Sequence, residues 1–281
     1  MPEGVECLIV AESIQKWAQG QDTNHVGYTS FNLEEVYNKV VTRNSPISPT
    51  FWNEHLNKLN YYKISTFGKT IFLPFENFRL SIQLGMTGTF SEQKTDHSRI
   101  RFCSDYSSLY YNDMRKFGHI MCFEKHNPPR NISNLLKNSI DWRNKNAPEL
   151  FAKRVVKRKQ WIDSEIKPLL MNQQLIAGIG NIYACEGLLL ARIDPRTKVK
   201  DIPSKKLAQI IVECQNIMNK SYSVGGMSVY TFTSFGKQGF GKRYLNVYNQ
   251  QGILCNQCKS SIIQKTLQQG RSTYYCPTCQ K

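Results

Sequence analysis

The sequence contains no apolar run approaching the length of a membrane-spanning helix, which excludes a transmembrane segment. Its first residues do not form a basic stretch followed by an apolar core, so no secretory signal is evident. We also find no long internal repeat and no low-complexity block. With 281 residues and 40% hydrophobic content, the chain can bury real cores and is expected to form two domains.

Acidic residues are scarce in the second half of the chain. Residues 1–150 hold 17 lysines and arginines against 15 acids, whereas residues 151–281 hold 20 against 6, and the total charge is +16. From residue 202 onward the single acid is Glu213. This uneven charge is typical of a protein that binds a polyanion. A solvated basic face or a membrane surface is the alternative, but no basic anchor helix or lipidation motif supports the membrane. A nucleic acid is therefore favoured.

Five of the nine cysteines stand alone in apolar neighbourhoods, which favours buried thiols in a reducing compartment over disulfides. The other four form two pairs near the end of the chain. A gap of two residues within each pair lets both sulfurs reach one metal, and the spacing predicts one structural zinc ion bound by four thiolates. These predicted metal ligands are Cys255, Cys258, Cys276 and Cys279.

The 17 residues between the two cysteine pairs are enough for a β-hairpin. We expect an outgoing strand over Ser260–Leu267, a turn at residues 268–270 and a return strand over Arg271–Tyr275. Arg271 would then lie near the tip, where it could enter a nucleic-acid groove. A ribbon with only a structural or protein-binding role is the alternative.

The remaining elements follow the periodicity of the apolar residues. Residues 6–19 show helical spacing, and short β-rich runs separated by turns then continue to about residue 125. Helical periodicity returns from residue 149. The expected fold is α+β. Its first domain, over 1–130, is a β-sandwich that carries an N-terminal helix, and an irregular linker follows over 131–148. The rest is a helical domain over 149–224, a functional loop region over 225–246 and a zinc-finger hairpin over 247–281.

Three separated segments together resemble one known family. They are the start Met1–Glu6, the glycine turn Gly178–Ala184, and the four-cysteine finger with its Gly270-Arg271 tip. They resemble the Fpg/Nei family, the formamidopyrimidine-DNA glycosylases and endonuclease VIII-like enzymes of base excision repair. The resemblance covers essentially the whole chain in family order, and it implies that the helical domain is a helix-two-turn-helix (H2TH) domain. Further matching segments are Gly68-Lys69, Leu84–Gly88 and Asp113–Gly118.

Pro2 can carry covalent chemistry if Met1 is removed, because the new N-terminus is a secondary amine that can attack a sugar carbon. Taken alone, Pro2 is more often just a common second residue. The resemblance makes it the nucleophile and makes Glu3 the acid that protonates the sugar as the base leaves. Glu6 is an ordinary first-turn helix acid or a supporting catalytic residue. Lys69 is a solvated turn lysine or, as the resemblance implies, a phosphate-binding residue of the catalytic site.

Five residues are candidates for contact with DNA. Asn181 follows two glycines at a turn between helices, where it could grip phosphate or cap a helix end. Arg271 offers two donors matched to a phosphate. An enzyme that extrudes a base must fill the gap left in the stack, and the resemblance implies that Met86, Arg115 and Phe117 do so. The alternative for Met86 and Phe117 is the core of the sandwich.

The resemblance predicts a bifunctional DNA glycosylase and AP lyase that forms a Schiff base through its N-terminal proline and then carries out β,δ-elimination. Gly4 resembles the Nei-like branch, which removes mainly oxidised pyrimidines and also formamidopyrimidines, and we favour that branch. The Met/Arg/Phe set and the long loop resemble the Fpg branch, so an 8-oxoguanine- and formamidopyrimidine-specific enzyme is the alternative. A catalytically silent zinc-finger protein that binds damaged DNA is an alternative of another class.

The expected partner is double-stranded DNA with oxidised bases or abasic sites, and single-stranded DNA stays open as a second partner. Zinc is the one expected cofactor, and it is structural because four thiolates leave no open position for substrate. We expect a monomer that neither binds membranes nor is secreted and that is found wherever the DNA is, in a nucleus, cytoplasm or nucleoid.

Overall fold

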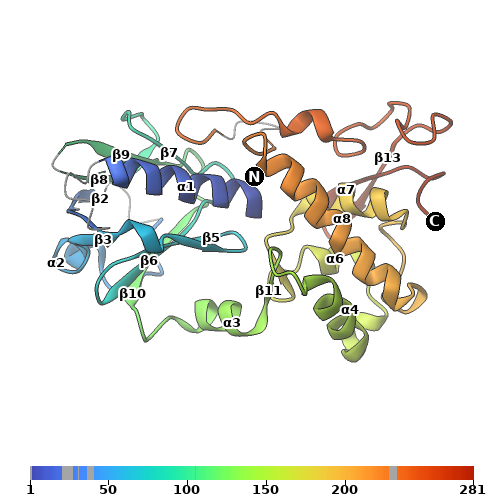
Figure 1. Cartoon of the computed structure of the whole chain (residues 1–281), viewed down its shortest axis with the longest axis horizontal. Helices are drawn as coiled ribbons and strands as arrows, with labels where there is room; N and C mark the ends of the chain where they lie inside the picture. Colours follow the sequence, from blue (N-terminus) through green and yellow to red (C-terminus); the bar gives the residue numbers. More distant parts are fainter. Residues whose placement is uncertain (1, 21–27, 31, 37–40, 105, 228–232) are drawn as a thin grey trace. The chain divides into compact units, whose positions relative to one another are not determined.

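The structure is a computed structural model that describes residues 2–20, 28–30, 32–36, 41–104, 106–227 and 233–281. It divides into two compact units (Figure 1). Unit 1 comprises Met1–Ser133 with Gly225–Phe240, and unit 2 comprises Asn134–Val224 with Gly241–Lys281. The two units are described separately below.

Unit 1 begins with the helix α1, Gly4–Gly20. The predicted spacing is confirmed, because Cys7, Val10, Ile14 and Trp17 are all buried along one face of this helix. α1 starts two residues earlier than the apolar pattern indicated, which brings the second and third residues of the chain to its first turn.

Two four-stranded antiparallel sheets form the body of unit 1, as the predicted β-sandwich requires. One sheet has the order β10-β6-β5-β4 and the other has the order β2-β8-β9-β7. The strands of the first are β4 (Ser65–Phe67), β5 (Thr70–Pro74), β6 (Phe78–Gln83) and β10 (His119–Glu124). Those of the second are β2 (Asn32–Val36), β7 (Thr89–Ser91), β8 (Ser98–Cys103) and β9 (Ser108–Asn112).

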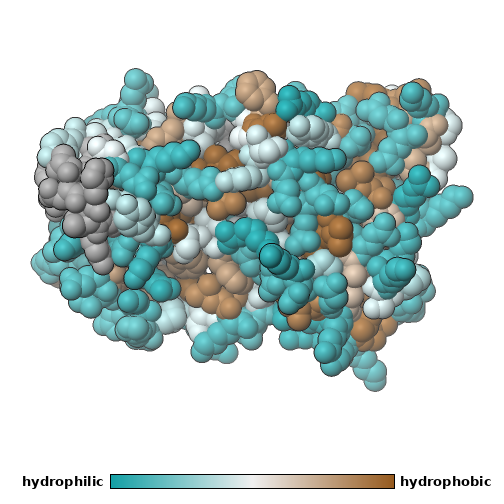
Figure 2. All heavy atoms as spheres, in the orientation of Figure 1, coloured by the Kyte–Doolittle hydropathy of each residue, from teal (hydrophilic) through white to brown (hydrophobic). Residues whose placement is uncertain are grey.

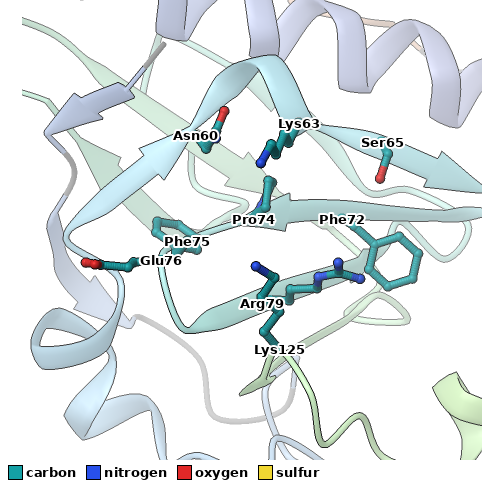
Figure 3. Close-up of a pocket in the computed structure, with 9 residues that line it drawn as sticks. All are labelled: Asn60, Lys63, Ser65, Phe72, Pro74, Phe75, Glu76, Arg79 and Lys125. Carbon is teal, nitrogen blue, oxygen red and sulfur yellow. The ribbon is translucent and has the colours of Figure 1, made fainter. Parts of the chain in front are cut away.

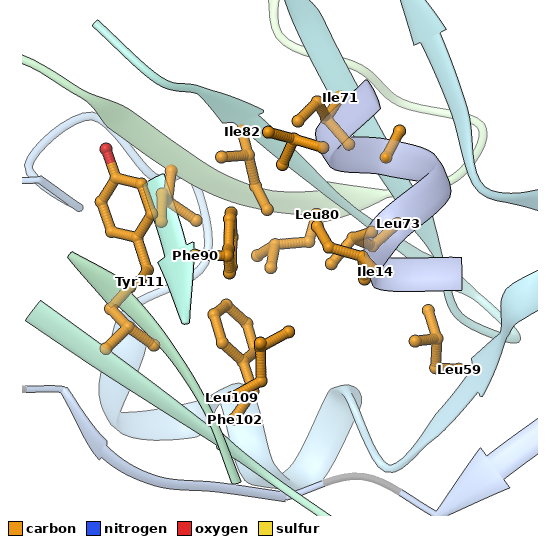
Figure 4. Packing of buried hydrophobic residues seen from close by; sticks show 14 of the residues in the cluster. Ile14, Leu59, Ile71, Leu73, Leu80, Ile82, Phe90, Phe102, Leu109 and Tyr111 are labelled. Atoms are coloured by element: carbon orange, nitrogen blue, oxygen red, sulfur yellow. The ribbon is translucent and has the colours of Figure 1, made fainter. Parts of the chain in front are cut away.

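The core of unit 1 is built from both sheets and from α1 (Figure 4). Ile14 of the helix, Leu80 of the first sheet and Phe102 of the second sheet belong to the same buried cluster. Shorter elements connect these parts: β1 (Tyr28–Ser30) paired with β3 (Lys58–Asn60), η1 (Pro49–Phe51), α2 (Trp52–His55) and η2 (Tyr61–Lys63).

Unit 2 is mainly helical. Its two long helices, α7 (Asn181–Ala191) and α8 (Ser204–Tyr222), pack against each other, and α4 (Ala147–Lys157) packs against α8. The shorter elements are α5 (Lys159–Ile162), α6 (Ile166–Leu170), β12 (Ile176–Ala177), η3 (Val199–Asp201) and η4 (Gly241–Tyr244).

Residues 131–148, predicted to be irregular, contain regular structure instead. The helix α3 spans Arg130–Asn138 and buries Ile132 and Leu135, and the short strand β11 spans Ile140–Asp141. β11 pairs in parallel with β12, and its partner lies more than thirty residues further along the chain. The sequence did not indicate β11, because a pairing at that distance leaves no local signal. It did not indicate α3, because only two apolar residues mark its buried face. The boundaries of the predicted domains themselves stay a prediction.

The chain ends in the expected hairpin, formed by β13 (Gln264–Gln268) and β14 (Arg271–Tyr275). Gln269 and Gly270 make the turn, and both have positive φ angles. No helix in the described part of the chain is long and apolar enough to cross a bilayer. On the face shown in Figure 2, apolar residues lie in separate patches among hydrophilic side chains.

Candidate active site

The first turn of α1 gathers the predicted catalytic acids. Pro2, Glu3 and Glu6 are all buried, and the two acids are only 1% and 2% exposed. The backbone N–H of Glu3 donates to Oε2 of Glu6 over 2.9 Å. The carboxylate of Glu6 therefore holds the backbone beside Pro2 in place, which is a positioning role as well as a helix-start role.

Glu6 also connects α1 to a distant segment of unit 1. Its Oε1 accepts the backbone N–H of Met227 over 2.8 Å. Gly226 has φ +95°, and a Cβ there would lie 3.2 Å from the same oxygen of Glu6. The close approach and the positive φ both favour glycine at this position. The sequence alone did not indicate this link.

Lys69 lies in the turn between β4 and β5, after Gly68 at φ +55°. The thiol of Cys7 donates to the backbone carbonyl of Lys69 over 3.4 Å, so the turn lies beside the first turn of α1. Burial raises the pKa of Cys7 to about 12, with a smaller contribution from Glu6. The thiol therefore remains a protonated donor at neutral pH and is not a nucleophile.

The segment 225–246 begins on unit 1 and continues into η4. Residues 228–232 lie outside the described part, but their flanks are anchored. The hydroxyl of Thr89 donates to the carbonyl of Thr233 over 2.5 Å, and the N–H of Phe235 donates to the carbonyl of Phe90 over 3.2 Å. The predicted loop region thus returns to the sandwich after passing Glu6.

The three predicted gap-filling residues lie together in unit 1. The guanidinium of Arg115 lies 4.5 Å from the ring centroid of Phe117 and donates to the sulfur of Met86 over 3.3 Å. Met86 and Phe117 are 40% and 50% exposed. They therefore belong to an exposed cluster and not to the sandwich core, which was the alternative.

Two residues that the sequence did not single out hold this cluster together. The Thr87 hydroxyl donates to Oδ1 of Asp113 over 2.5 Å and accepts the backbone N–H of Arg115 over 3.1 Å. Asp113 is fully buried, and its Oδ2 accepts the N–H of Gly118 over 2.8 Å. Burial, and next the carboxylate of Asp113, raise the pKa of Tyr111. Both residues lie within segments that resemble the family, Leu84–Gly88 and Asp113–Gly118, but the resemblance gave neither residue a role.

In unit 2, Asn181 begins α7, after a turn in which Gly178 has φ +110°. A Cβ on Gly178 would lie 2.1 Å from the ring of Trp142, so only glycine fits there. The side-chain amide of Asn181 donates to the carbonyl of Ser272, over 2.9 Å, next to Arg271. Arg271 is exposed at the first position of β14. The start of α7 and the tip of the hairpin are therefore neighbours.

The four predicted metal ligands converge at the base of the hairpin. Their sulfurs all lie within 4.8 Å of one another, and the Sγ–Sγ distances are 3.8 Å for Cys255–Cys279 and 3.7 Å for Cys258–Cys276. A tetrahedral zinc with Zn–S bonds of about 2.3 Å requires sulfurs about 3.8 Å apart. The donor set and its geometry fit one structural zinc ion, as predicted.

A further buried acid joins the zinc finger to the helical domain. Glu186, on the otherwise apolar helix α7, accepts the backbone N–H groups of Asn246, Val247 and Tyr248 over 2.8–2.9 Å. Burial raises the pKa of Glu186, and these hydrogen bonds oppose the rise. The sequence analysis missed this residue, although a lone acid within an apolar helix could have indicated it.

The chain matches known proteins over both units. Residues 1–120 match the family described as the formamidopyrimidine-DNA glycosylase N-terminal domain, and residues 133–233 match the formamidopyrimidine-DNA glycosylase H2TH domain. A Mycoplasmopsis pulmonis protein named formamidopyrimidine-DNA glycosylase is 31% identical, over 100% of this chain and 98% of that protein. A protein of the same name from Exiguobacterium sibiricum is 28% identical, over 100% of this chain and 99% of that protein.

Solved structures give the same result. A variant of Lactococcus lactis FPG in complex with DNA containing Fapy-dG matches over 100% of both chains, with TM-score 0.82 and 26% identity. Thermus thermophilus MutM (FPG) matches 99% of this chain and 98% of its own, with TM-score 0.83 and 23% identity, and supports the fold. The predicted fold class is confirmed, whereas the Nei-like branch is not distinguished. The chain belongs to the formamidopyrimidine-DNA glycosylase family of DNA repair enzymes.

Proposed function

We propose that this protein is an Fpg-type DNA glycosylase and AP lyase that removes formamidopyrimidine and 8-oxoguanine lesions from duplex DNA. The relatives reported above carry the Fpg name, and this favours the Fpg alternative over the Nei-like preference based on Gly4. The observation that carries the mechanism is the buried network of Glu3, Glu6 and Met227 next to Pro2.

Pro2, with Met1 removed, is the proposed nucleophile. Its nitrogen lone pair attacks C1′ of the damaged nucleotide, the bond between C1′ and the base breaks with its electron pair leaving on the base, and the N–H proton that Pro2 loses neutralises the departing base. The carboxyl of Glu3 donates a proton to the ring oxygen O4′ as this bond breaks, which opens the sugar and leaves an iminium between Pro2 and C1′. Burial of both residues excludes bulk water from this step.

The iminium makes the neighbouring C2′ proton acidic, since it can accept the electron pair of the C2′–H bond. Loss of that proton expels the 3′-phosphate by β-elimination, and a second elimination expels the 5′-phosphate. The carboxylate of Glu3 is the proposed proton carrier, and Glu6 is a positioning residue that fixes the backbone of Glu3. Water then releases the sugar fragment from Pro2.

Lys69, Asn181 and Arg271 are the proposed phosphate contacts. The side-chain amide nitrogen of Asn181 donates to the carbonyl of Ser272, so its contribution is to join the N-terminus of α7, a favourable place for an anion, to the finger arginine. Met86, Arg115 and Phe117 are the proposed fillers of the gap left by the extruded base, because they form one exposed cluster.

The proposal is tested by borohydride trapping of the protein on duplexes that carry an abasic site, formamidopyrimidine, 8-oxoguanine or thymine glycol. Mass spectrometry first establishes that Pro2 is the N-terminal residue of the sample. We expect a covalent adduct that is lost in Pro2→Gly, and faster excision of the two purine lesions than of thymine glycol. The matched control is Gly20→Ala, at a site with nothing within 4 Å of an added Cβ.

Each outcome decides between the proposed activities. Adduct formation by Pro2→Gly at the normal rate would refute the nucleophile. Faster excision of thymine glycol would restore the Nei-like preference. DNA binding without an adduct on any duplex, with Pro2 free, would show a catalytically silent damaged-DNA-binding protein.

A further inference from the structure

A concave pocket outside the candidate active site lies in unit 1, at the β5–β6 turn (Figure 3). Its cavity volume is about 250 Å³. The lining combines three cations, three apolar residues, two neutral polar residues and one acid. The lining residues are Asn60, Lys63, Ser65, Phe72, Pro74, Phe75, Glu76, Arg79 and Lys125.

The three cations of this pocket have no ion-pair partner in the described part of the chain. Lys63 comes from η2, Arg79 from β6 and Lys125 from the residue after β10. Figure 3 shows Lys63 on one side of Pro74 and the other two cations on the opposite side. The lining also includes one acid, Glu76, whose carboxylate points away from the three cations in Figure 3, so the pocket carries a net positive charge that favours an anionic ligand.

The rest of the lining shows what must accompany the anion. Phe72 and Phe75 are buried and Pro74 is half-buried, so they form an apolar floor. The side-chain oxygen of Asn60 is buried and has no hydrogen-bond partner among the described residues. A rotation of that amide would let it pair with a ligand N–H, which would remove the cost of an unsatisfied polar atom.

The pocket lies at the end of the sheet opposite to the residues proposed to contact DNA. β5 runs from the Lys69 turn to Pro74, and β6 runs from Arg79 toward Met86. β10 begins just after Phe117 and ends just before Lys125. The five residues of β5 cover about 13 Å from first to last at the usual rise per residue. Within unit 1, the pocket is therefore separate from the gap-filling cluster.

We propose that this pocket binds an acidic segment of a partner protein, with a carboxylate between the three cations and an apolar side chain against the floor. A peptide supplies all three groups at once: the anion, the apolar group and a backbone N–H for Asn60. The cavity is smaller than the roughly 300–1,000 Å³ of sites that enclose small organic ligands. In duplex DNA the bases are stacked inside the helix, so a duplex offers phosphates to the cations but no apolar group to Phe72 and Phe75.

The test is fluorescence anisotropy of a labelled peptide that has several acidic residues and a terminal phenylalanine, at physiological salt. The control peptide has asparagine and glutamine in place of the acids. The double variant Lys63→Ala/Lys125→Ala removes two exposed cations and leaves the core intact. We expect it to bind the acidic peptide at least about tenfold more weakly, because a charge-assisted contact is commonly worth such a factor.

Lys16→Ala is the matched control, since it removes an exposed lysine of the same unit outside the pocket lining. We expect Lys16→Ala to bind the peptide as the unchanged protein does and both variants to cleave lesion-bearing duplex normally. Equal binding of the neutral peptide, or by the double variant, would overturn the proposal. An equal loss of duplex affinity in the double variant would identify a nucleic-acid contact, and displacement by inorganic phosphate as readily as by unlabelled peptide would identify a small-anion site.

Discussion

Replacing Thr87 by valine tests whether one hydroxyl holds the gap-filling cluster in its shape. Valine keeps the shape of threonine and removes both hydrogen bonds of the hydroxyl, one to Asp113 and one from the N–H of Arg115. Losing the bond from Arg115 costs little, because Arg115 is exposed and water can replace the hydroxyl. Losing the bond to Asp113 removes a donor from a residue that is 0% exposed, which costs about 2 kcal/mol.

That loss is a local one and is best measured locally. Amide hydrogen exchange at Gly118, whose N–H donates to Asp113, reports the opening of the loop that carries Phe117. A loss of about 2 kcal/mol corresponds to exchange roughly 30-fold faster in Thr87→Val if the loop opens independently. Thr87→Ser keeps the hydroxyl and serves as the control. Exchange at the same rate in both variants would refute the argument that this hydroxyl anchors the cluster.

Three further predictions concern other buried groups. Glu186→Gln should destabilise unit 2 by about 1–3 kcal/mol in urea unfolding, since an amide cannot accept on both sides from the N–H groups at residues 246–248; unchanged stability would show that these contacts are dispensable. Cys276→Ser should lower the bound zinc below one equivalent by metal analysis, and a full equivalent would contradict the four-thiolate site. The pKa of Cys7 is raised to about 12 from 9.0, so its contribution to stability is complete below pH 9 and is lost as the pH rises toward 12. Cys7→Ala should therefore flatten the decline in the urea midpoint above pH 9, and an identical slope would contradict that pKa shift.

Local patterns were sufficient to predict much of the fold. The helical spacing of Cys7, Val10 and Ile14 identified α1, and the cysteine spacing identified the zinc site and its hairpin. Each of these signals lies within about 25 consecutive residues. The pairing of β11 with β12 and the contact of Glu186 with residues 246–248 join segments 36 or more residues apart, so the sequence shows the lone acid of α7 but neither its partners nor the strand pairing.

The candidate site divides in the same way. The residues proposed to react with or contact the DNA, such as Glu3 and Met86, were predicted because they resemble a family pattern. Glu6 was predicted to support the site, but its hydrogen bond to Met227 was not predicted, and neither was the bond from Thr87 to Asp113, since a hydrogen bond between distant segments leaves no motif. Sequence patterns therefore indicate the reacting groups better than the groups that position them.

The net charge of a stretch of sequence does not show where its charged residues lie in the folded protein. Residues 1–150 hold 17 basic and 15 acidic residues, so the charge count alone indicates polyanion binding only in the second half, and the DNA contacts predicted in the first half, such as Lys69 and Arg115, rest on the family resemblance. In the antiparallel sheet, basic residues from different strands lie near the same end of the sheet. Arg79 and Lys125 come together at one end, with Lys63 of η2, and Lys69 lies in a turn at the other. Residues 1–150, which are almost neutral overall, can thus carry a basic pocket apart from the Lys69 turn, and comparing peptide and duplex affinity in the same variants decides whether the two regions bind different partners.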